Sequence, residues 1–201
     1  MLGKTNVKVK PNKKVDYVEY IESTGTQYID TGIVPKSTTR MEIKLKYNDL
    51  NGNQTMGWGS GSSQEAFHLG FIGVYEEFIV SVSSNYSFGF SGVPKDEAIH
   101  TFDLKSGSQK IDGVQFGTDT IGNTASVGQT LFLFALYAEW VTSRATDFCK
   151  CNLYYCKLYD GDTLVRDFKP VKDGAGIYCL YDEVEKRYYY NQGSGSFTGG
   201  A

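Results

Sequence analysis

Apolar and polar side chains alternate along much of the chain after Asp16, which is typical of strands with one face in a core and one in water. The clearest case is the stretch 41–47, where apolar residues occupy the odd positions and charged residues the even ones. The same alternation recurs in three further stretches, 67–71, 78–82 and 99–104. These stretches are therefore predicted to be strands of a sheet that packs on one side only.

Two further stretches refine this prediction. The stretch 109–116 contains Asp112-Gly113, a pair that tolerates positive φ and favours a tight hairpin turn. The stretch 131–137 is apolar at both odd and even positions, which predicts a central strand covered on both faces. No stretch shows a helical repeat with caps. We expect one domain over 16–201, with about a dozen strands in two antiparallel sheets that pack face to face as a β-sandwich.

The composition agrees with this all-β prediction. The chain has 201 residues, with 23 Gly, 15 Tyr and 12 Phe against 4 Pro and 2 His, and turn formers and aromatic residues are typical of β-proteins. Its formal charge of −3 argues against specific nucleic-acid binding by the whole surface. The longest apolar run, 131–138, is far shorter than a membrane-spanning helix requires, so we expect no membrane insertion.

The first fifteen residues are predicted to form a basic N-terminal arm. They contain no acidic residue and too few apolar residues to bury a core, and their lysines are Lys4, Lys8, Lys10, Lys13 and Lys14. Such an arm either pairs onto a sheet as an edge strand or docks on a partner. The N-terminus lacks the apolar stretch of a secretory signal, so we expect synthesis in the cytoplasm without export.

The four cysteines, Cys149, Cys151, Cys156 and Cys179, are poorly spaced for a disulfide framework and are expected to be free thiols. Cys149 and Cys151 fall on one face of a strand, which is too cramped for a usual zinc site. A calcium ion could lie near Asp160-Gly161-Asp162, but this sequence is more typical of a turn. We therefore expect no metal and no other cofactor.

A set of motifs resembles a known family. They are YIESTGTQYIDTGI at 20–33, IDG at 111–113, LFLFA at 131–135, YCKLYD at 155–160, LVRDF at 164–168, GIYCLYD at 176–182 and GSGSFT at 193–198. Together they resemble the concanavalin A-like (laminin G-like) jelly-roll domains of bacteriophage and prophage structural proteins, from about Tyr17 to the C-terminus. The resemblance implies a jelly-roll β-sandwich that often binds glycans and is often mounted on tail, fibre or capsid proteins.

Catalysis is not expected. Glycosidases of this fold place paired carboxylates on one strand as Glu-x-Asp-x-x-Glu, and this string is absent from the sequence. Glu76 and Glu77 would point to opposite faces, and the charged stretch 182–186 is predicted to be a hairpin turn. His68 and His100 lie in strand-like stretches without a nucleophile elbow, so both are predicted to be packing or surface residues.

Binding is better supported. Sugar rings stack on aromatic side chains, while their hydroxyl groups require amides or carboxylates nearby. Trp58 lies in a glycine-rich stretch after Asn53 and Gln54, although it could equally be a core residue of a short strand. The candidate ligand-binding residues are Trp58, Asn53, Gln54, Tyr86, Tyr137, Trp140 and Arg144.

The favoured hypothesis is therefore a non-enzymatic virion protein that binds host-surface or mucus glycans, present in several copies and attached to other virion proteins by its arm. The alternative is a purely architectural virion subunit that binds no glycan. A glycoside hydrolase is the third hypothesis. A binder requires an exposed aromatic residue near polar groups, whereas an architectural subunit requires large contacts with its neighbours.

Overall fold

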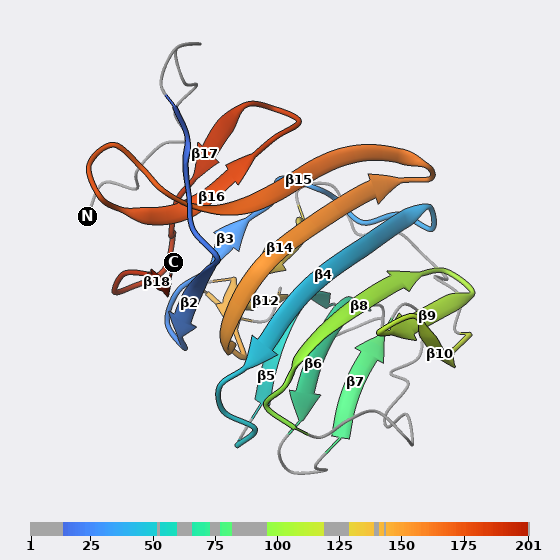
Figure 1. Cartoon of the computed structure of the whole chain (residues 1–201). Coiled ribbons are helices and arrows are strands. Elements are labelled where there is room, and N and C mark those ends of the chain that lie inside the picture. The colour runs from blue at the N-terminus through green and yellow to red at the C-terminus, as the bar shows by residue number, and fades with distance from the viewer. Residues whose placement is uncertain are drawn as a thin grey trace.

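The computed structural model describes residues 14–51, 53–59, 66–72, 77–81, 96–118, 129–138, 141–142 and 144–200, with only the backbone at 53–59, 66, 68, 71–72 and 77–81. Every regular element within these residues is a β-strand, which confirms the predicted all-β class. The strands form two large, mainly antiparallel sheets (Figure 1). Among the described residues they number eighteen, more than expected, because several have only two or three residues.

The larger sheet, sheet A, contains eleven strands. They are β1 (Asp16–Tyr17), β2 (Tyr20–Thr24), β4 (Thr39–Tyr47), β8 (Ile99–Lys105), β9 (Ser108–Ile111), β10 (Val114–Gly117), β14 (Lys150–Asp160), β15 (Thr163–Lys172), β16 (Tyr178–Asp182), β17 (Arg187–Tyr189) and β18 (Thr198–Gly200). The smaller sheet, sheet B, contains seven strands. They are β3 (Ile29–Asp30), β5 (Asn53–Gly59), β6 (Ala66–Ile72), β7 (Glu77–Ser81), β11 (Phe132–Leu133), β12 (Leu136–Ala138) and β13 (Ala145–Thr146).

Strands β4 and β14 lie side by side at the centre of sheet A. Along β4, buried and half-buried residues alternate without a break, which confirms the strand predicted at 41–47. Along β14 the alternation changes phase: Cys151 and Leu153 are buried before a shift in register, and Cys156 and Leu158 are buried after it. A β-bulge inserts one residue, and here it keeps both halves of a long strand facing the core.

The predicted hairpin turn at Asp112-Gly113 is confirmed. Strands β9 and β10 pair on either side of it, with Val114 opposite Ile111. Asp112 and Gly113 have φ angles of 49° and 81°, so both central residues of the turn have positive φ. This is the backbone that a two-residue turn needs to match the twist of its flanking strands.

The apolar stretch 131–137 is buried almost throughout, as predicted, but it is not one strand. It forms β11 and β12, which are separated by a bend at Phe134, where φ is 67°. Phe134 accepts a hydrogen bond from Cys149 N at 2.8 Å, so the bend is fixed from a distant part of the chain. Strand β11 then pairs with β3 and β5, and β12 runs parallel to β5.

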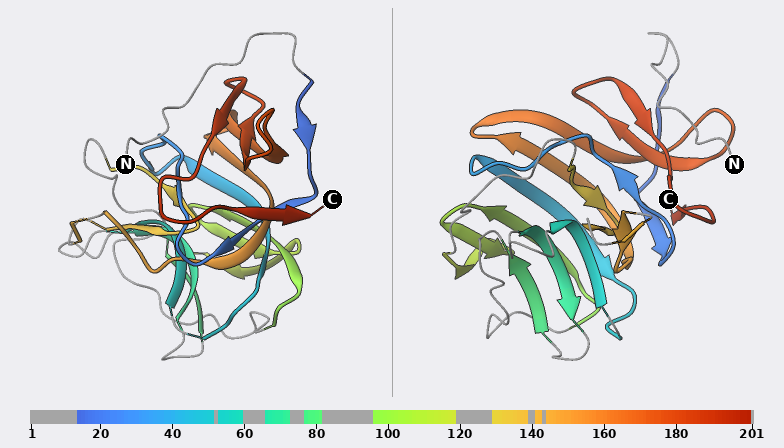
Figure 2. Two further views of the ribbon diagram at one scale, coloured as in Figure 1. Left: turned by 90° about the vertical axis from the view of Figure 1, so that its left-hand side faces the viewer. Right: turned by 180° about the vertical axis from the view of Figure 1, so that it is seen from behind.

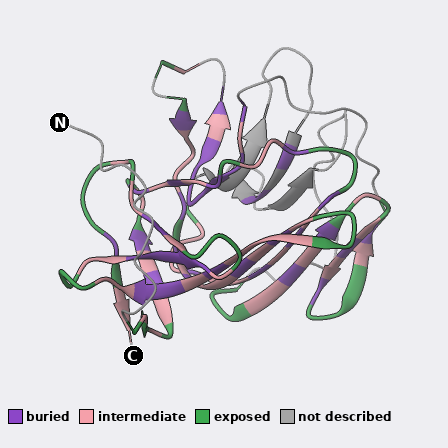
Figure 3. Cartoon of the chain, turned by 90° about the horizontal axis from the view of Figure 1, so that it is seen from above, coloured by how far each residue is buried: buried purple, intermediate pink, exposed green. Residues whose placement is uncertain are grey.

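The two sheets form two layers around one apolar core (Figure 2, Figure 3). Sheet A contributes Ile43 and Leu153, and sheet B contributes Ile29, Phe67 and Leu133, all of which are 1% exposed or less. Side chains on the other face of each strand remain outside this core. The arrangement is sandwich-like, as the alternation of the sequence predicts.

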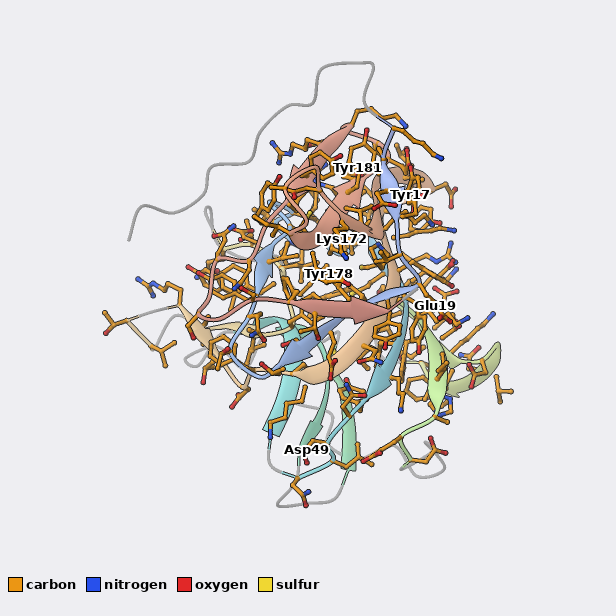
Figure 4. All side chains as sticks on the ribbon, turned by 60° about the vertical axis from the view of Figure 1, so that its left-hand side comes forward. Tyr17, Glu19, Asp49, Lys172, Tyr178 and Tyr181 are labelled. Carbon is orange, nitrogen blue, oxygen red and sulfur yellow. The ribbon has the colours of Figure 1, made fainter. Side chains whose placement is uncertain are left out.

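Strands β15, β16 and β17 are apolar on both faces. Phe168, Leu180 and Tyr189 belong to the main core, whereas their neighbours form a second apolar cluster on the opposite side of sheet A. This cluster consists of Val171, Cys179, Tyr181 and Tyr188, with Val15 and Tyr190 packed against it. Tyr17 and Tyr181 lie close together at this end of the molecule (Figure 4). Strand β1, which pairs with β15, therefore lies beside an apolar surface.

Candidate functional site

Four aromatic side chains gather at a separate apolar cluster of sheet B, and one of them, Tyr137, also packs against the main core. Phe132 alternates with the core residues Leu131 and Leu133 and belongs to this separate cluster. Its ring stacks on Tyr28 with a centroid separation of 4.7 Å and contacts Tyr137 edge-on at 5.1 Å. We call Tyr28, Phe132, Tyr137 and Phe148 the sheet B aromatic cluster.

Three of its members keep part of their surface in solvent. Tyr28, Tyr137 and Phe148 are half-buried, whereas Phe132 is 4% exposed. Phe148 lies 6.4 Å from Tyr28 between ring centroids, so the partly exposed rings surround a buried one. Aromatic rings supported from beneath in this way present rigid faces to a ligand, at little cost in side-chain entropy.

The C-terminal segment fixes the backbone of Tyr28. Tyr28 N donates to Asn191 Oδ1 at 3.1 Å, and Gln192 N donates to the Tyr28 carbonyl at 2.9 Å. Burial, and then the nearby charge of Asp30, raises the pKa of the Tyr28 hydroxyl. This hydroxyl therefore remains protonated at neutral pH and can donate a hydrogen bond.

Two of the predicted binding residues, Tyr137 and Arg144, lie near each other along the backbone of sheet B. Tyr137 in β12 pairs with Ala145 in β13, directly after Arg144. Arg144 is exposed and has a φ of 60°. Its carbonyl accepts a hydrogen bond from Ala138 N at 2.9 Å, which closes the short connection between β12 and β13.

Trp58 is placed beside Tyr137 by backbone register, since the two are neighbours in the parallel pair β5–β12. On the other side of β5, Trp58 lies opposite Phe67. Asn53 and Gln54 begin β5, four or five positions before Trp58, which separates them from it by roughly 13–17 Å along the strand. The grouping of the Trp58 ring with these two amides stays a prediction, since only the backbone of 53–59 is described.

The remaining predicted binding and arm residues are only partly covered by the structure. Tyr86, Trp140, Lys4, Lys8, Lys10 and Lys13 lie outside the described residues, whereas Lys14 is described and exposed. Sequence reasoning missed Tyr28, Phe132 and Phe148. The sequence does contain a signal for Phe132. Its stretch is apolar at both odd and even positions, so either the odd or the even side chains must lie outside the main core.

The opening and closing motifs of the sequence contact each other. Gln27 is 1% exposed, and its side-chain oxygen accepts hydrogen bonds from Ser23 Oγ at 3.0 Å and Thr24 N at 2.9 Å. A Cβ atom at Gly193 would lie 2.1 Å from the Thr26 carbonyl oxygen, so only glycine permits this approach. These motifs therefore hold the two ends of the domain together. They also position the backbone next to Tyr28, a member of the sheet B aromatic cluster.

Residues 183–186 of the charged stretch form the hairpin turn between β16 and β17, as predicted, but Asp182 is the last residue of β16 and is not on the surface. It has no exposed surface and accepts hydrogen bonds from Asp167 N at 2.9 Å and Val184 N at 3.0 Å. Glu185 Oε1 lies 2.8 Å from Arg166 Nη1. Asp182 thus accepts hydrogen bonds from backbone amides and Glu185 pairs with a guanidinium. Both carboxylates have a structural role at the turn.

His100, predicted to be a packing or surface residue, is half-buried between two carboxylates. Its Nδ1 lies 2.6 Å from Asp112 Oδ2, and its Nε2 lies 2.9 Å from Asp96 Oδ1. Burial lowers the pKa of His100, but the hydrogen bonds to Asp112 and Asp96 outweigh this effect and raise the pKa overall. His100 therefore links the segment before β8 to the β9–β10 turn.

All four cysteines are buried and unpaired, as predicted. Within the described part of the chain, no group of three or more His, Cys, Asp or Glu side chains could bind a metal ion. The described residues also contain no helix long and apolar enough to cross a membrane. A comparison of the chain with protein-family models, curated proteins and solved structures finds no match.

Proposed function

We propose that this protein is a non-enzymatic bacteriophage virion protein whose domain binds host-surface or mucus glycans. The domain would be a β-sandwich of the concanavalin A-like jelly-roll type, as the sequence resemblance implies. The observation that carries the proposal is the sheet B aromatic cluster, in which partly exposed tyrosine rings contact Phe132, while the exposed Arg144 directly precedes Ala145, the backbone partner of Tyr137.

The chemistry of this cluster suits a sugar. The C–H faces of a pyranose ring can stack on Tyr28 or Tyr137, and sugar hydroxyl groups can hydrogen-bond to Arg144 and to the protonated hydroxyl of Tyr28. A shallow site of this kind gives weak affinity for a single sugar. Many copies on one particle would raise the overall affinity through multivalency.

The test is a glycan array probed with the whole chain at high surface density. We expect a restricted set of glycans to bind, with signals reduced by Tyr137→Ala, Arg144→Ala, Trp58→Ala and Trp140→Ala. Tyr17→Ala is the matched control, because Tyr17 is 53% exposed and belongs to β1 in the other sheet. Absence of binding on the array would favour the architectural alternative.

A further inference from the structure

On the side of sheet A that faces away from sheet B, the strands β4, β8, β9, β14 and β15 carry a surplus of positive charge, and this part is here called the outer face of sheet A. Next to it, Glu22 of β2 lies opposite Asn152 on the same side, and Asp49 Oδ2 lies 2.6 Å from Lys150 Nζ. The residues of the outer face alternate with buried ones along its five strands. Eight of these outward residues are basic and three are acidic: Arg40, Lys44, Lys46, Lys105, Lys110, Lys150, Lys157 and Lys169 against Glu42, Asp103 and Asp167. The whole chain has a net charge of −3, so the charge of this face is opposite in sign to that of the chain as a whole.

Tyrosine rings position several of these cations. Lys157 Nζ and Lys169 Nζ lie 5.5 Å and 5.3 Å from the centroid of the Tyr155 ring. The Arg40 guanidinium carbon lies 4.8 Å from the centroid of the Tyr159 ring. A cation packed against a ring has less side-chain freedom to lose when a ligand binds.

The three carboxylates of this face lie among the cations. Asp103 Oδ1 lies 2.7 Å from Arg40 Nε, Asp167 Oδ1 lies 3.0 Å from Lys169 Nζ, and Glu42 Oε1 lies 3.7 Å from Lys157 Nζ. Asp103 and Glu42 retain lone pairs that can accept further hydrogen bonds, whereas the Oδ1 atom of Asp167 is buried. The face therefore offers charged donors, acceptors and aromatic rings within a few strand spacings of one another.

We infer that the outer face of sheet A binds an acidic polysaccharide, one that carries sulfate or carboxylate groups as well as hydroxyl groups. Lysines and Arg40 pair with the anionic groups, two of the carboxylates accept hydrogen bonds from sugar hydroxyls, and Tyr155 and Tyr159 contact sugar C–H groups. Duplex DNA fits less well, because its backbone offers no hydroxyl donors to the carboxylates of this face. This inference rests on the proposed role in glycan binding, but it assigns a separate surface and a charged class of glycan.

The experiment uses the whole chain with heparin as the sulfated probe, polygalacturonate as the carboxylated probe and dextran as the neutral one. Binding is measured by titration calorimetry at about 50 mM and about 500 mM salt, because exposed charge pairs are screened strongly at the higher concentration. We expect binding to one or both acidic polymers at low salt, a large loss at high salt, and no binding to dextran.

The test variant is Lys157→Gln/Lys169→Gln, which removes two charges from the outer face of sheet A. The matched control is Lys36→Gln/Lys186→Gln, which removes two exposed charges outside this face. We expect the test variant to weaken binding by roughly tenfold or more, and the control to leave it nearly unchanged. If the test variant unfolds, Lys44→Gln/Lys46→Gln replaces it on the same face.

Tyr137→Ala separates this inference from the proposed function. It should leave binding of the acidic polymers intact, even where it abolishes binding on the glycan array.

Failure of both acidic polymers to bind at low salt overturns the inference, as does an equal loss in the control variant. Equally tight binding of duplex DNA through the same lysines would show a general polyanion surface. Self-association that needs Lys157 and Lys169, without polymer binding, would assign the face to a second copy of the chain. Either result also overturns the inference.

Discussion

The carboxylate of Asp182 lies beneath the β16–β17 turn, with its Oδ2 atom 3.6 Å from Arg166 Nε in the neighbouring strand β15. Neither side chain is freely hydrated, because Asp182 has no exposed surface and the side chain of Arg166 is 11% exposed. Arg166 Nε also donates to the Thr31 carbonyl at 3.2 Å. The pair thus connects the C-terminal hairpin to the segment that follows β3.

Removal of the Asp182 carboxylate should therefore destabilise the fold strongly. Asp182→Ala leaves two backbone amides without their acceptor and a buried guanidinium without this partner, which typically costs about 3–5 kcal/mol. Asp182→Asn retains a side-chain oxygen and should cost less. The measurement is the urea-unfolding midpoint at constant m. Asp160→Ala is the control, since the Asp160 ion pair with Lys36 is exposed to solvent and should contribute little to stability. Equal losses for Asp182→Ala and Asp160→Ala would contradict this role of Asp182.

Gly193 is expected to be the glycine least tolerant of a side chain. The Cβ atom of Gly193→Ala would lie 2.1 Å from the Thr26 carbonyl oxygen, so the C-terminal segment must move away from Tyr28. We expect a lower melting temperature and looser packing of the sheet B aromatic cluster around Tyr28. Gly161→Ala isolates the backbone cost, because Gly161 has a φ of 60° and open space around it. That variant should lose only about 1–2 kcal/mol. A melting temperature for Gly193→Ala at or above that of Gly161→Ala would refute the prediction.

The parts of the fold that could be predicted from sequence are those that depend on local alternation. Strand β4 and the Asp112-Gly113 turn follow from neighbouring residues alone. The bulge near Tyr155 and the bend at Phe134 could not be predicted, because each depends on partners from distant strands. The sequence predicts a turn at 182–186, but Asp182 itself ends β16 and is buried, and its amide donors are revealed only when β15 and β16 pair.

The candidate site shows the same limit. Tyr137 and Arg144 were found because they lie close together in sequence, next to an apolar run. Tyr28 and Phe148 were missed because long-range pairing of β3 and β11 brings their rings to Phe132 and Tyr137. The outer face of sheet A could not be delimited either, since its charges come from five separate strands.

His100 should make stability depend on pH near neutrality. Its pKa is raised in the folded state, so the folded chain binds this proton more tightly than the unfolded chain does. The resulting stabilisation is fully present below the unfolded pKa of about 6.5 and is lost as the pH rises through the folded value. The urea midpoint of the wild type should therefore fall as the pH rises above about 6.5. His100→Gln should remove this part of the pH dependence, and an unchanged profile in that variant would assign the dependence to another group.

The four thiols should be inert while the chain is folded. Burial raises the pKa of Cys156 and, to about 12, that of Cys179, and the additional charges near each thiol act in the same direction. Because the thiolate is the nucleophile, both low access and a raised pKa slow its reactions. A thiol-reactive chromophore at neutral pH should label almost no cysteine in the native chain and all four in urea. Cys179→Ser is the informative variant, since Cys179 lies in the second apolar cluster near β1, away from the main core. Rapid labelling of the native chain that disappears in Cys179→Ser would show that β1 opens readily from β15, contrary to this prediction.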